Sequence, residues 1–209
     1  MLVDDHAVVR TGFRLLLQAC DDIEVVAEAD SGEAACQMYE AVAPDVVVMD
    51  IAMAGMGGIE AIKRLLAKNS RARILALSAH EDTSHPKRAL QAGALGYLSK
   101  RSAPEVLIDA IRLIAKGQRY LDAQIAQRMA VQNLTGTQGP MEKLSAREFE
   151  VFVQLAHGQS VAQISETLAL SASTVGTHLY NIKQKLGLVN QAEMALLAVR
   201  HGLIDVAAS

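Results

Sequence analysis

The first 117 residues repeat one pattern, in which a short apolar run precedes a stretch whose apolar residues recur at helical spacing. The apolar runs cover residues 2–3, 23–29, 46–49, 74–77 and 94–98. An unbroken run such as 46–49 is typical of a strand that is buried on both faces of a sheet. Strands that alternate with helices form right-handed βαβ units, so the pattern predicts an α/β fold with a doubly wound, five-stranded parallel sheet. The strand patterns stop after Gly117.

Polar residues stand directly after four of these runs. They are Asp4, Asp5, Asp50, Ser78 and Lys100. Taken alone, an aspartate after a strand is more often a turn residue or a helix cap, and a lysine there is more often a solvated loop residue. The carboxyl ends of parallel strands, however, lie at one edge of the sheet, where the active sites of doubly wound folds are found. Five such residues at one predicted edge favour a functional site.

Several carboxylates beside one ammonium group suit phosphoryl transfer. A carboxylate such as Asp50 can attack phosphorus to form an aspartyl phosphate. Because both reacting groups are anionic, the reaction needs a cation, and Mg²⁺ or Mn²⁺ bound by Asp4, Asp5 and Asp50 would supply it. Lys100 can pair with one phosphoryl oxygen, and the hydroxyl group of Ser78 can donate a hydrogen bond to another.

The second part of the chain contains only helical patterns. A helix is predicted over 122–131, and residues 133–140 form a turn-rich linker that is the best candidate for a domain boundary. Ser145 and Glu148 fit a capping box at the start of the next helix. A short helix over 161–168, a turn at 170–173 and a longer helix over 174–186 predict a helix-turn-helix unit. The domains expected are 1–117, the helix and linker 118–143, and the all-α domain 144–209.

Composition excludes several classes of protein. No apolar run approaches the roughly 18 residues that a membrane span needs, and no basic segment followed by an apolar one opens the chain, so a cytoplasmic protein is expected. Cys20 and Cys36 match no metal or disulfide spacing and are expected to be reduced thiols. Residues 141–209 carry 5 Lys and Arg against 6 Asp and Glu, so any DNA binding there must depend on local charge placement.

The motifs of the first part closely resemble a bacterial response-regulator receiver domain, a flavodoxin-like fold. The resemblance rests on the motifs at 4–6, 50, 53–58, 78–79 and 97–100. It implies that Asp50 is the phosphoacceptor and that Asp4, Asp5, Asp50 and the backbone carbonyl group of Ala52 bind Mg²⁺ or Mn²⁺.

The same resemblance implies roles for three further residues. Lys100 would bind the phosphoryl group, and Ser78 and Tyr97 would form a switch pair that moves towards it. Without the family pattern, Tyr97 would be read as a half-buried strand aromatic. The phosphodonor implied is a partner histidine kinase or a small acyl phosphate. The protein would not be an enzyme, because it would only accept and lose its own phosphoryl group.

Residues 144–204 resemble the LuxR-type helix-turn-helix of NarL/FixJ response regulators. The resemblance implies that the helix 174–186 lies in the major groove of double-stranded DNA and that phosphorylation favours a homodimer on paired half-sites. The candidate DNA contacts are Ser173, Thr174, Thr177, His178, Tyr180, Asn181, Lys183 and Gln184.

The chain departs from the receiver pattern at three places. Ala54 and Arg101 stand where the family usually has proline, which predicts a less rigid loop after the phosphoacceptor and an altered turn after Lys100. Only three residues precede Asp4, whereas strands usually have about five, so the natural protein is expected to have a longer first strand.

The helix-turn-helix also departs from its pattern. Ala162, Gly176 and Gln191 stand where the family often has lysine or arginine, or another polar contact residue. Each lost phosphate contact reduces the salt dependence of DNA binding by about one unit of slope. An alternative function is therefore a phosphorylation-gated protein-interaction regulator whose DNA binding is weak or lost. A phosphatase of the aspartate-nucleophile type is disfavoured, because Ala52 stands where such enzymes carry a second acid.

Overall fold

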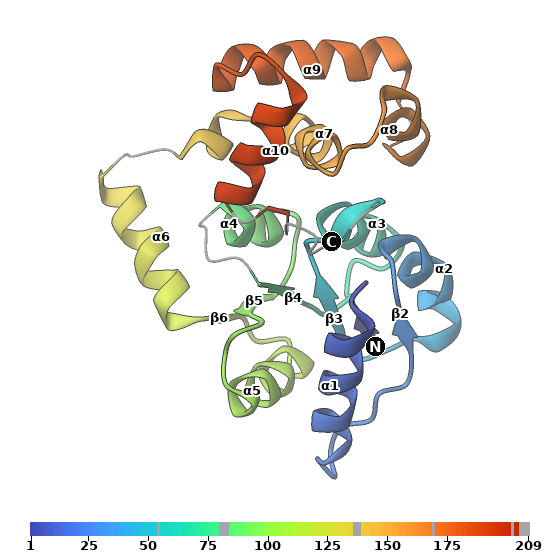
Figure 1. The fold of residues 1–209 in the computed structure, drawn as a ribbon. Coiled ribbons are helices and arrows are strands. Elements are labelled where there is room, and N and C mark those ends of the chain that lie inside the picture. The colour runs from blue at the N-terminus through green and yellow to red at the C-terminus, as the bar shows by residue number, and fades with distance from the viewer. Residues whose placement is uncertain (54, 80–83, 136–138, 169, 202, 205–209) are drawn as a thin grey trace. The chain divides into compact units, whose positions relative to one another are not determined.

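The first part of the chain folds into a parallel sheet with helices on both faces. The computed structural model describes residues 1–204 apart from 54, 80–83, 136–138, 169 and 202. The sheet order is β2-β1-β3-β4-β5-β6, and all neighbouring strands pair in parallel (Figure 1). The strands are β1 (Leu2–Val3), β2 (Glu28–Ala29), β3 (Val47–Asp50), β4 (Ile74–Ser78), β5 (Gly96–Ser99) and β6 (Tyr120–Leu121).

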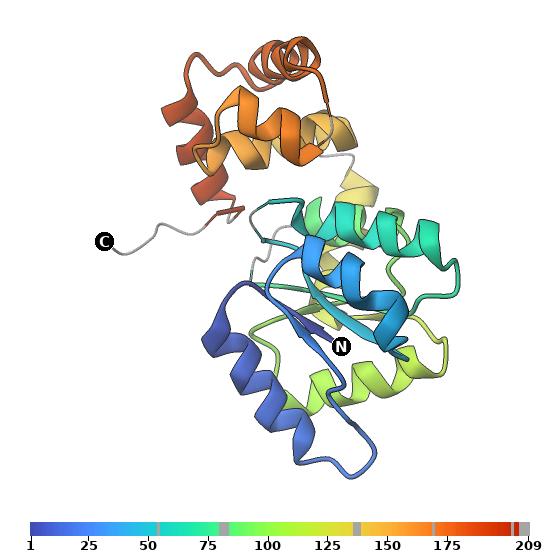
Figure 2. The same cartoon turned by 90° about the vertical axis from the view of Figure 1, so that its right-hand side faces the viewer.

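Five helices connect these strands and cover the sheet. They are α1 (Ala7–Gln18), α2 (Gly32–Val42), α3 (Gly57–Lys68), α4 (Ser84–Gln91) and α5 (Pro104–Ala115). Helices α1 and α5 lie on one face of the sheet, and α2, α3 and α4 lie on the other (Figures 1 and 2). Leu75, Leu77 and Leu98 belong to the buried cluster that also contains Leu107 and Ile111 of α5. The doubly wound fold predicted from the sequence is confirmed.

Two predictions about strands were wrong. The sheet has a sixth strand, although strand patterns were expected to stop after Gly117. Strand β6 has only two residues, too few to show a periodicity, and the Tyr120 N–H donates to the Leu95 carbonyl oxygen at 3.2 Å. The strand expected over 23–29 is reduced to β2, because β1 has only two residues, and within this run they pair with Glu28 and Ala29 alone.

Gly57 and Gly58, the last residues of the 53–58 motif, are the first two residues of α3. Helix α3 begins directly against the end of β3. A Cβ atom on Gly58 would lie 2.0 Å from the carbonyl oxygen of Asp50, so only glycine permits this approach. Gly58 is therefore a packing requirement of the helix start that follows the candidate phosphoacceptor, whereas Gly57 has open space around it and a φ of +71°, which favours glycine.

The second part of the chain is entirely helical where it is described. Its elements are α6 (Ala123–Thr135), the 3₁₀ helix η1 (Pro140–Lys143), α7 (Ala146–Ala156), α8 (Val161–Leu168), α9 (Ala172–Leu186) and α10 (Gln191–Arg200). The chain divides into two compact units between Ala126 and Gln127, within α6. Residues 136–138 of the expected linker lie outside the described residues, and the domain boundaries stay a prediction.

The capping residues of these helices explain where they begin. Ser145 and Glu148 form the predicted capping box at the start of α7. The turn expected at 170–173 was placed too far along the chain, because α9 begins at Ala172. The Oγ atom of Ser171 accepts a hydrogen bond from the Thr174 N–H at 3.1 Å and so caps α9. None of the helices in the described part of the chain is long and apolar enough to cross a membrane.

Candidate functional site

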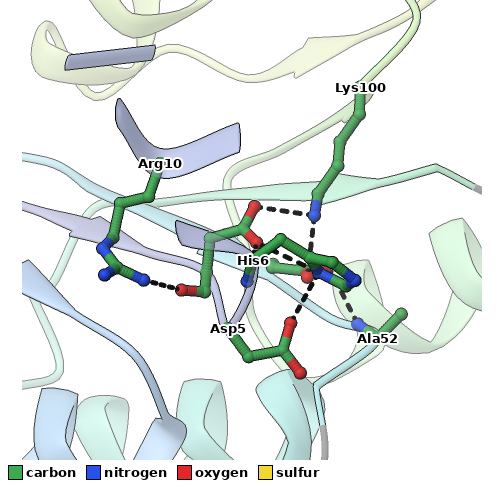
Figure 3. A network of polar contacts seen from close by, with 7 residues as sticks. Asp5, His6, Arg10, Ala52 and Lys100 are labelled. Atoms are coloured by element: carbon green, nitrogen blue, oxygen red, sulfur yellow. Dashed lines mark hydrogen bonds and ion pairs between the residues drawn. The ribbon is translucent and has the colours of Figure 1, made fainter. Parts of the chain in front are cut away.

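The carboxyl ends of β1, β3 and β5 bring three charged side chains into contact. The Nζ atom of Lys100 lies 2.7 Å from Oδ2 of Asp4 and 2.8 Å from Oδ2 of Asp50 (Figure 3). The side chains of Asp4 and Asp50 are 4% and 1% exposed, and that of Lys100 is 11% exposed. One nearly buried cation therefore serves two buried carboxylates, at the sheet edge that the sequence predicted.

Three hydrogen bonds hold the backbone and the side chain of Asp4 in place. Its N–H donates to the Ala29 carbonyl oxygen of β2, and its Oδ1 accepts from the His6 N–H at 2.9 Å. The Nη1 atom of Arg10 donates to the Asp4 carbonyl oxygen at 2.6 Å, and Arg10 is itself held by Glu28 at 3.2 Å (Figure 3). The sequence analysis did not identify Arg10. The signal that could have found it is a positively charged residue about one helical turn after the Asp4–Asp5 pair.

The surroundings of Asp50 raise its pKa above the ordinary value of an aspartate. Its Oδ1 accepts a hydrogen bond from the Ala52 N–H at 3.0 Å, which leaves Oδ2 to face Lys100. Burial raises the pKa of Asp50, and the neighbouring Asp4 carboxylate adds to this rise, although Lys100 opposes both. A carboxylate in such a place is stabilised by additional positive charge.

Lys100 keeps its proton in this setting. Burial alone would lower the pKa of Lys100, but the Asp50 and Asp4 carboxylates outweigh burial and raise it. The backbone of Lys100 is fixed because its N–H donates to the Ser78 carbonyl oxygen at 2.8 Å. Lys100 is therefore a permanent ammonium group directed at the two acids.

Four side chains at this edge could hold a metal ion. Asp4, Asp5, His6 and Asp50 each offer a ligand atom, and these atoms all lie within 4.8 Å of one another. Nδ1 of His6 lies 2.8 Å from Oδ1 of Asp5, which is the more exposed acid (Figure 3). Carboxylate oxygens are the ligands that Mg²⁺ takes, so the donor set fits that ion. The sequence included His6 in a motif but did not predict it as a candidate ligand.

Ser78 and Tyr97 lie on the two neighbouring strands β4 and β5 and are buried in the interior. Ser78 ends β4 and Tyr97 lies within β5, and both are fully buried. Tyr97 pairs in register with Ala76, two residues before Ser78. The alternative reading of Tyr97 as a half-buried aromatic does not hold, because its side chain is enclosed.

The predicted DNA contacts lie on α9, but they are not equally exposed. Ser173, Thr177, Tyr180 and Gln184 are exposed and follow one another at helical spacing, so they form a single stripe. The other four candidates are only partly exposed, and they are Thr174, His178, Asn181 and Lys183. The helix therefore presents mainly hydroxyl and amide groups along its open face.

The positive charge of α9 is confined to its last turn and partly neutralised. The Nζ atom of Lys185 lies 2.6 Å from Oε2 of Glu148, the buried capping-box residue of α7.

Gly176 is exposed, and a Cβ atom there would meet nothing within 4 Å. Gln191 donates from Nε2 to the Leu155 carbonyl oxygen at 2.8 Å, so this departure from the family pattern has a structural use.

A doubly wound sheet with an acidic pocket and a facing lysine, followed by a helix-turn-helix, defines a phosphorylation-controlled regulator. Residues 1–112 match the response regulator receiver domain, and residues 142–198 match the luxR family of bacterial regulatory proteins. The chain belongs to the response regulators of the NarL/FixJ type and functions in transcription regulation. This class has a histidine kinase and double-stranded DNA as partners, and its members are generally not enzymes.

Relatives and solved structures agree with this assignment. The chain is 41% identical to response regulator GacA of Pseudomonas viridiflava, with 100% of this chain and 98% of the relative covered. It is 42% identical to response regulator UvrY of Escherichia coli O6:H1, with 98% and 95% covered. The crystal structure of response regulator ChrA of a heme-sensing two-component system is similar with a TM-score of 0.55, 37% identity and 98% and 97% coverage.

A structure of a DNA complex is also similar. RcsB from Salmonella enterica serovar Typhimurium, bound to promoter P1flhDC in the presence of a phosphomimetic, matches with a TM-score of 0.74. The identity is 26%, and 94% of each chain is covered. The helix-turn-helix architecture of this chain is therefore one that occurs in promoter-bound response regulators.

Proposed function

We propose that Asp50 accepts a phosphoryl group and that this modification controls DNA binding by α9. The observation that supports the proposal is the contact of Lys100 with both Asp4 and Asp50 at the edge of the sheet. An Asp50 carboxylate oxygen forms a bond to phosphorus, and the bond from phosphorus to the donor nitrogen or oxygen breaks. The leaving group keeps that electron pair.

The residues around Asp50 have separate tasks in this proposal. Asp4, Asp5, Asp50 and the backbone carbonyl group of Ala52 would hold Mg²⁺, or Mn²⁺ in its place, which would supply positive charge for the phosphoryl oxygens. Lys100 leaves its two carboxylates in part and pairs with a phosphoryl oxygen. The hydroxyl group of Ser78 donates to another oxygen, and Tyr97 fills the space behind it.

Phosphorylation then shifts an equilibrium between two conformations of the receiver. The phosphorylated state exposes α9 and favours a homodimer, which binds paired half-sites in the major groove. The donor is a histidine kinase or a small acyl phosphate. The chain turns over no other substrate, and we place this activity in the cytoplasm.

The test is to treat the full chain with acetyl phosphate and Mg²⁺ and to measure its intact mass. We expect one added phosphoryl group on the wild-type protein and none on Asp50→Asn, with promoter binding increased only for the former. Asp45→Asn is the matched control, since Asp45 lies two residues before the start of the same strand, away from the candidate site. Phosphorylation of Asp50→Asn to the wild-type extent would exclude this phosphoacceptor.

A second function is favoured by the sparse positive charge of α9. With Lys185 held by Glu148, the helix offers DNA phosphates few cations, which suits a protein-interaction regulator with weak DNA binding. A gel shift on genomic fragments over a range of salt concentrations distinguishes the two functions. Fragments bound above the non-specific level after phosphorylation support the DNA-binding regulator, and their absence supports the alternative.

A further inference from the structure

The loop between β3 and α3 is anchored at both of its ends. This loop carries the carbonyl group of Ala52. The Ala52 N–H donates to Oδ1 of Asp50 at 3.0 Å, and the Gly58 N–H donates to the Ile51 carbonyl oxygen at 3.4 Å. Position 54, where the receiver pattern has proline, is alanine and lies outside the described residues. A loop without that proline has more conformations to lose when a ligand binds.

A third anchor comes from Glu33 in the first turn of α2. Its Oε1 accepts a hydrogen bond from the Met56 N–H at 2.7 Å, across 23 residues of sequence. A bond from an amide to a carboxylate is stronger than one between neutral groups. The side chains of Met53 and Met56 are also buried, so this loop is anchored by packing as well as by hydrogen bonds.

The loop passes very close to the Glu33 carboxylate. A Cβ atom on Gly55 would lie 2.9 Å from Oε1 of Glu33, and Gly55 has a φ of +73°. The positive φ favours glycine at that position. The Glu33 carboxylate therefore lies next to the backbone of Gly55 and also accepts the hydrogen bond from Met56.

Glu33 is presented from a firmly placed helix start. Ser31 caps α2 by accepting a hydrogen bond from the Ala34 N–H. A Cβ atom on Gly32 would lie 3.0 Å from the Cβ atom of Ala61 in α3, so the two helices approach closely. Because α2 cannot shift easily against α3, the Glu33 carboxylate is a fixed reference point for the loop.

We infer that Glu33 is a positioning residue for the proposed cation site. It holds the β3–α3 loop so that the carbonyl group of Ala52 stays within reach of a cation bound by Asp5 and Asp50. The hydrogen bond from Met56 to Glu33 restricts the conformations of the loop, as a proline at position 54 would do by restricting the backbone. Glu33 acts through the loop, not on the phosphoryl group. The inference rests on the proposed cation site.

The test is calorimetric titration of the full chain with Mg²⁺ alone. We expect Glu33→Ala to weaken Mg²⁺ binding about fivefold, because a charge-assisted hydrogen bond is lost and the loop must be ordered by the ion. Glu33→Gln keeps an acceptor oxygen and should bind nearly as the wild type does. Glu40→Ala is the matched control, since Glu40 lies on the exposed side of the same helix.

A rescue experiment separates positioning from folding. Ala54→Pro added to Glu33→Ala should restore Mg²⁺ affinity and slow the amide hydrogen exchange of Met56, which Glu33→Ala accelerates. Unchanged Mg²⁺ affinity in Glu33→Ala would overturn the inference. It would also be overturned if Glu33→Gln lost as much Mg²⁺ affinity as Glu33→Ala and if adding Ala54→Pro restored none of it. If the wild-type protein itself shows no Mg²⁺ binding, the proposed cation site fails instead.

Discussion

The Nζ atom of Lys100 lies 2.8 Å from Oδ2 of Asp50, although 50 residues separate the two in sequence. The same ammonium group also contacts Asp4 at 2.7 Å. Two buried carboxylates that share one cation repel each other, and burial alone already raises the pKa of Asp50. Lys100 therefore compensates the charge of Asp4 and Asp50 in the protein that carries no phosphoryl group.

Lys100→Met should destabilise the protein most when divalent cations are absent. Removing one partner of a buried ion pair leaves uncompensated charge, and we expect a loss of about 3 kcal/mol in the free energy of unfolding with EDTA present. Millimolar Mg²⁺ should recover part of it, because the ion neutralises Asp4 and Asp50. Urea unfolding in the two buffers measures the difference. Lys116→Met, at an exposed position, is the control, and equal losses with and without Mg²⁺ would contradict the expectation.

The meeting of Asp4, Asp50 and Lys100 was predictable from the sequence because parallel strands dictate where their ends meet. Asp4, Asp50 and Lys100 each follow an apolar run, and no long-range detail was needed to bring them to one edge. The contacts of Arg10 and Glu33 could not be foreseen in the same way. Both depend on the distance between elements that are adjacent in space but carry no shared pattern along the chain.

The fold was predictable where a segment makes its own hydrophobic signal. The run at 74–77 became β4 because all of its residues are buried. The run at 23–29 alternates in the strand sense and contains Glu24 and Glu28, but only Glu28 and Ala29 have a paired neighbour in the two-residue strand β1. Strand β6 is the opposite case, because its two residues show no strand pattern of their own but pair with the backbone of β5. In both cases the available pairing partner, and not the local sequence pattern, determined which residues form a strand.

The ion pair between Glu148 and Lys185 should make the stability of the helix-turn-helix depend on acidic pH. Burial would raise the pKa of Glu148, but hydrogen bonds from Lys185 and Ser145 outweigh it and lower the pKa below its ordinary value of 4.5. The ionised form therefore favours folding. Its contribution is complete above about pH 4.5 and is lost as the pH falls through the pKa of the folded state.

Glu148→Gln measures this contribution directly. Thermal melts of the variant and the wild type should differ most above pH 5 and converge as the pH falls through the lowered pKa of Glu148 in the folded state. Lys185→Met removes the partner and should reduce the same pH dependence. Melting curves of Glu148→Gln that stay parallel to those of the wild type over the whole pH range would show that the pair contributes no proton linkage.

Gln191 should contribute to stability although it lies at a predicted DNA-facing position. Its Nε2 donates to the Leu155 carbonyl oxygen at 2.8 Å and so ties the start of α10 to the end of α7. We expect Gln191→Ala to cost about 1 kcal/mol in the free energy of unfolding, the typical value of one hydrogen bond. Gln184→Ala, on the exposed stripe of α9, should cost less. Equal effects of the two substitutions on urea unfolding would argue against the tie.

Gly176 offers a direct way to ask whether α9 faces DNA phosphates. The position is exposed and has open space around it, so Gly176→Lys fits without repacking. We expect the variant to bind DNA more tightly and to steepen the dependence of log K on log salt by about one unit. The measurement is fluorescence anisotropy of a labelled DNA duplex between low and moderate salt.

Gly176→Ala is the control that separates charge from helix stability. Alanine and lysine both stabilise an exposed helix position by roughly 0.7–1 kcal/mol relative to glycine, but only lysine adds a cation. Both variants should therefore unfold at higher urea concentration than the wild type, and only Gly176→Lys should change the salt slope. If the two variants bind DNA with the same slope, position 176 does not face a phosphate, and the neutral residue there has no consequence for DNA affinity.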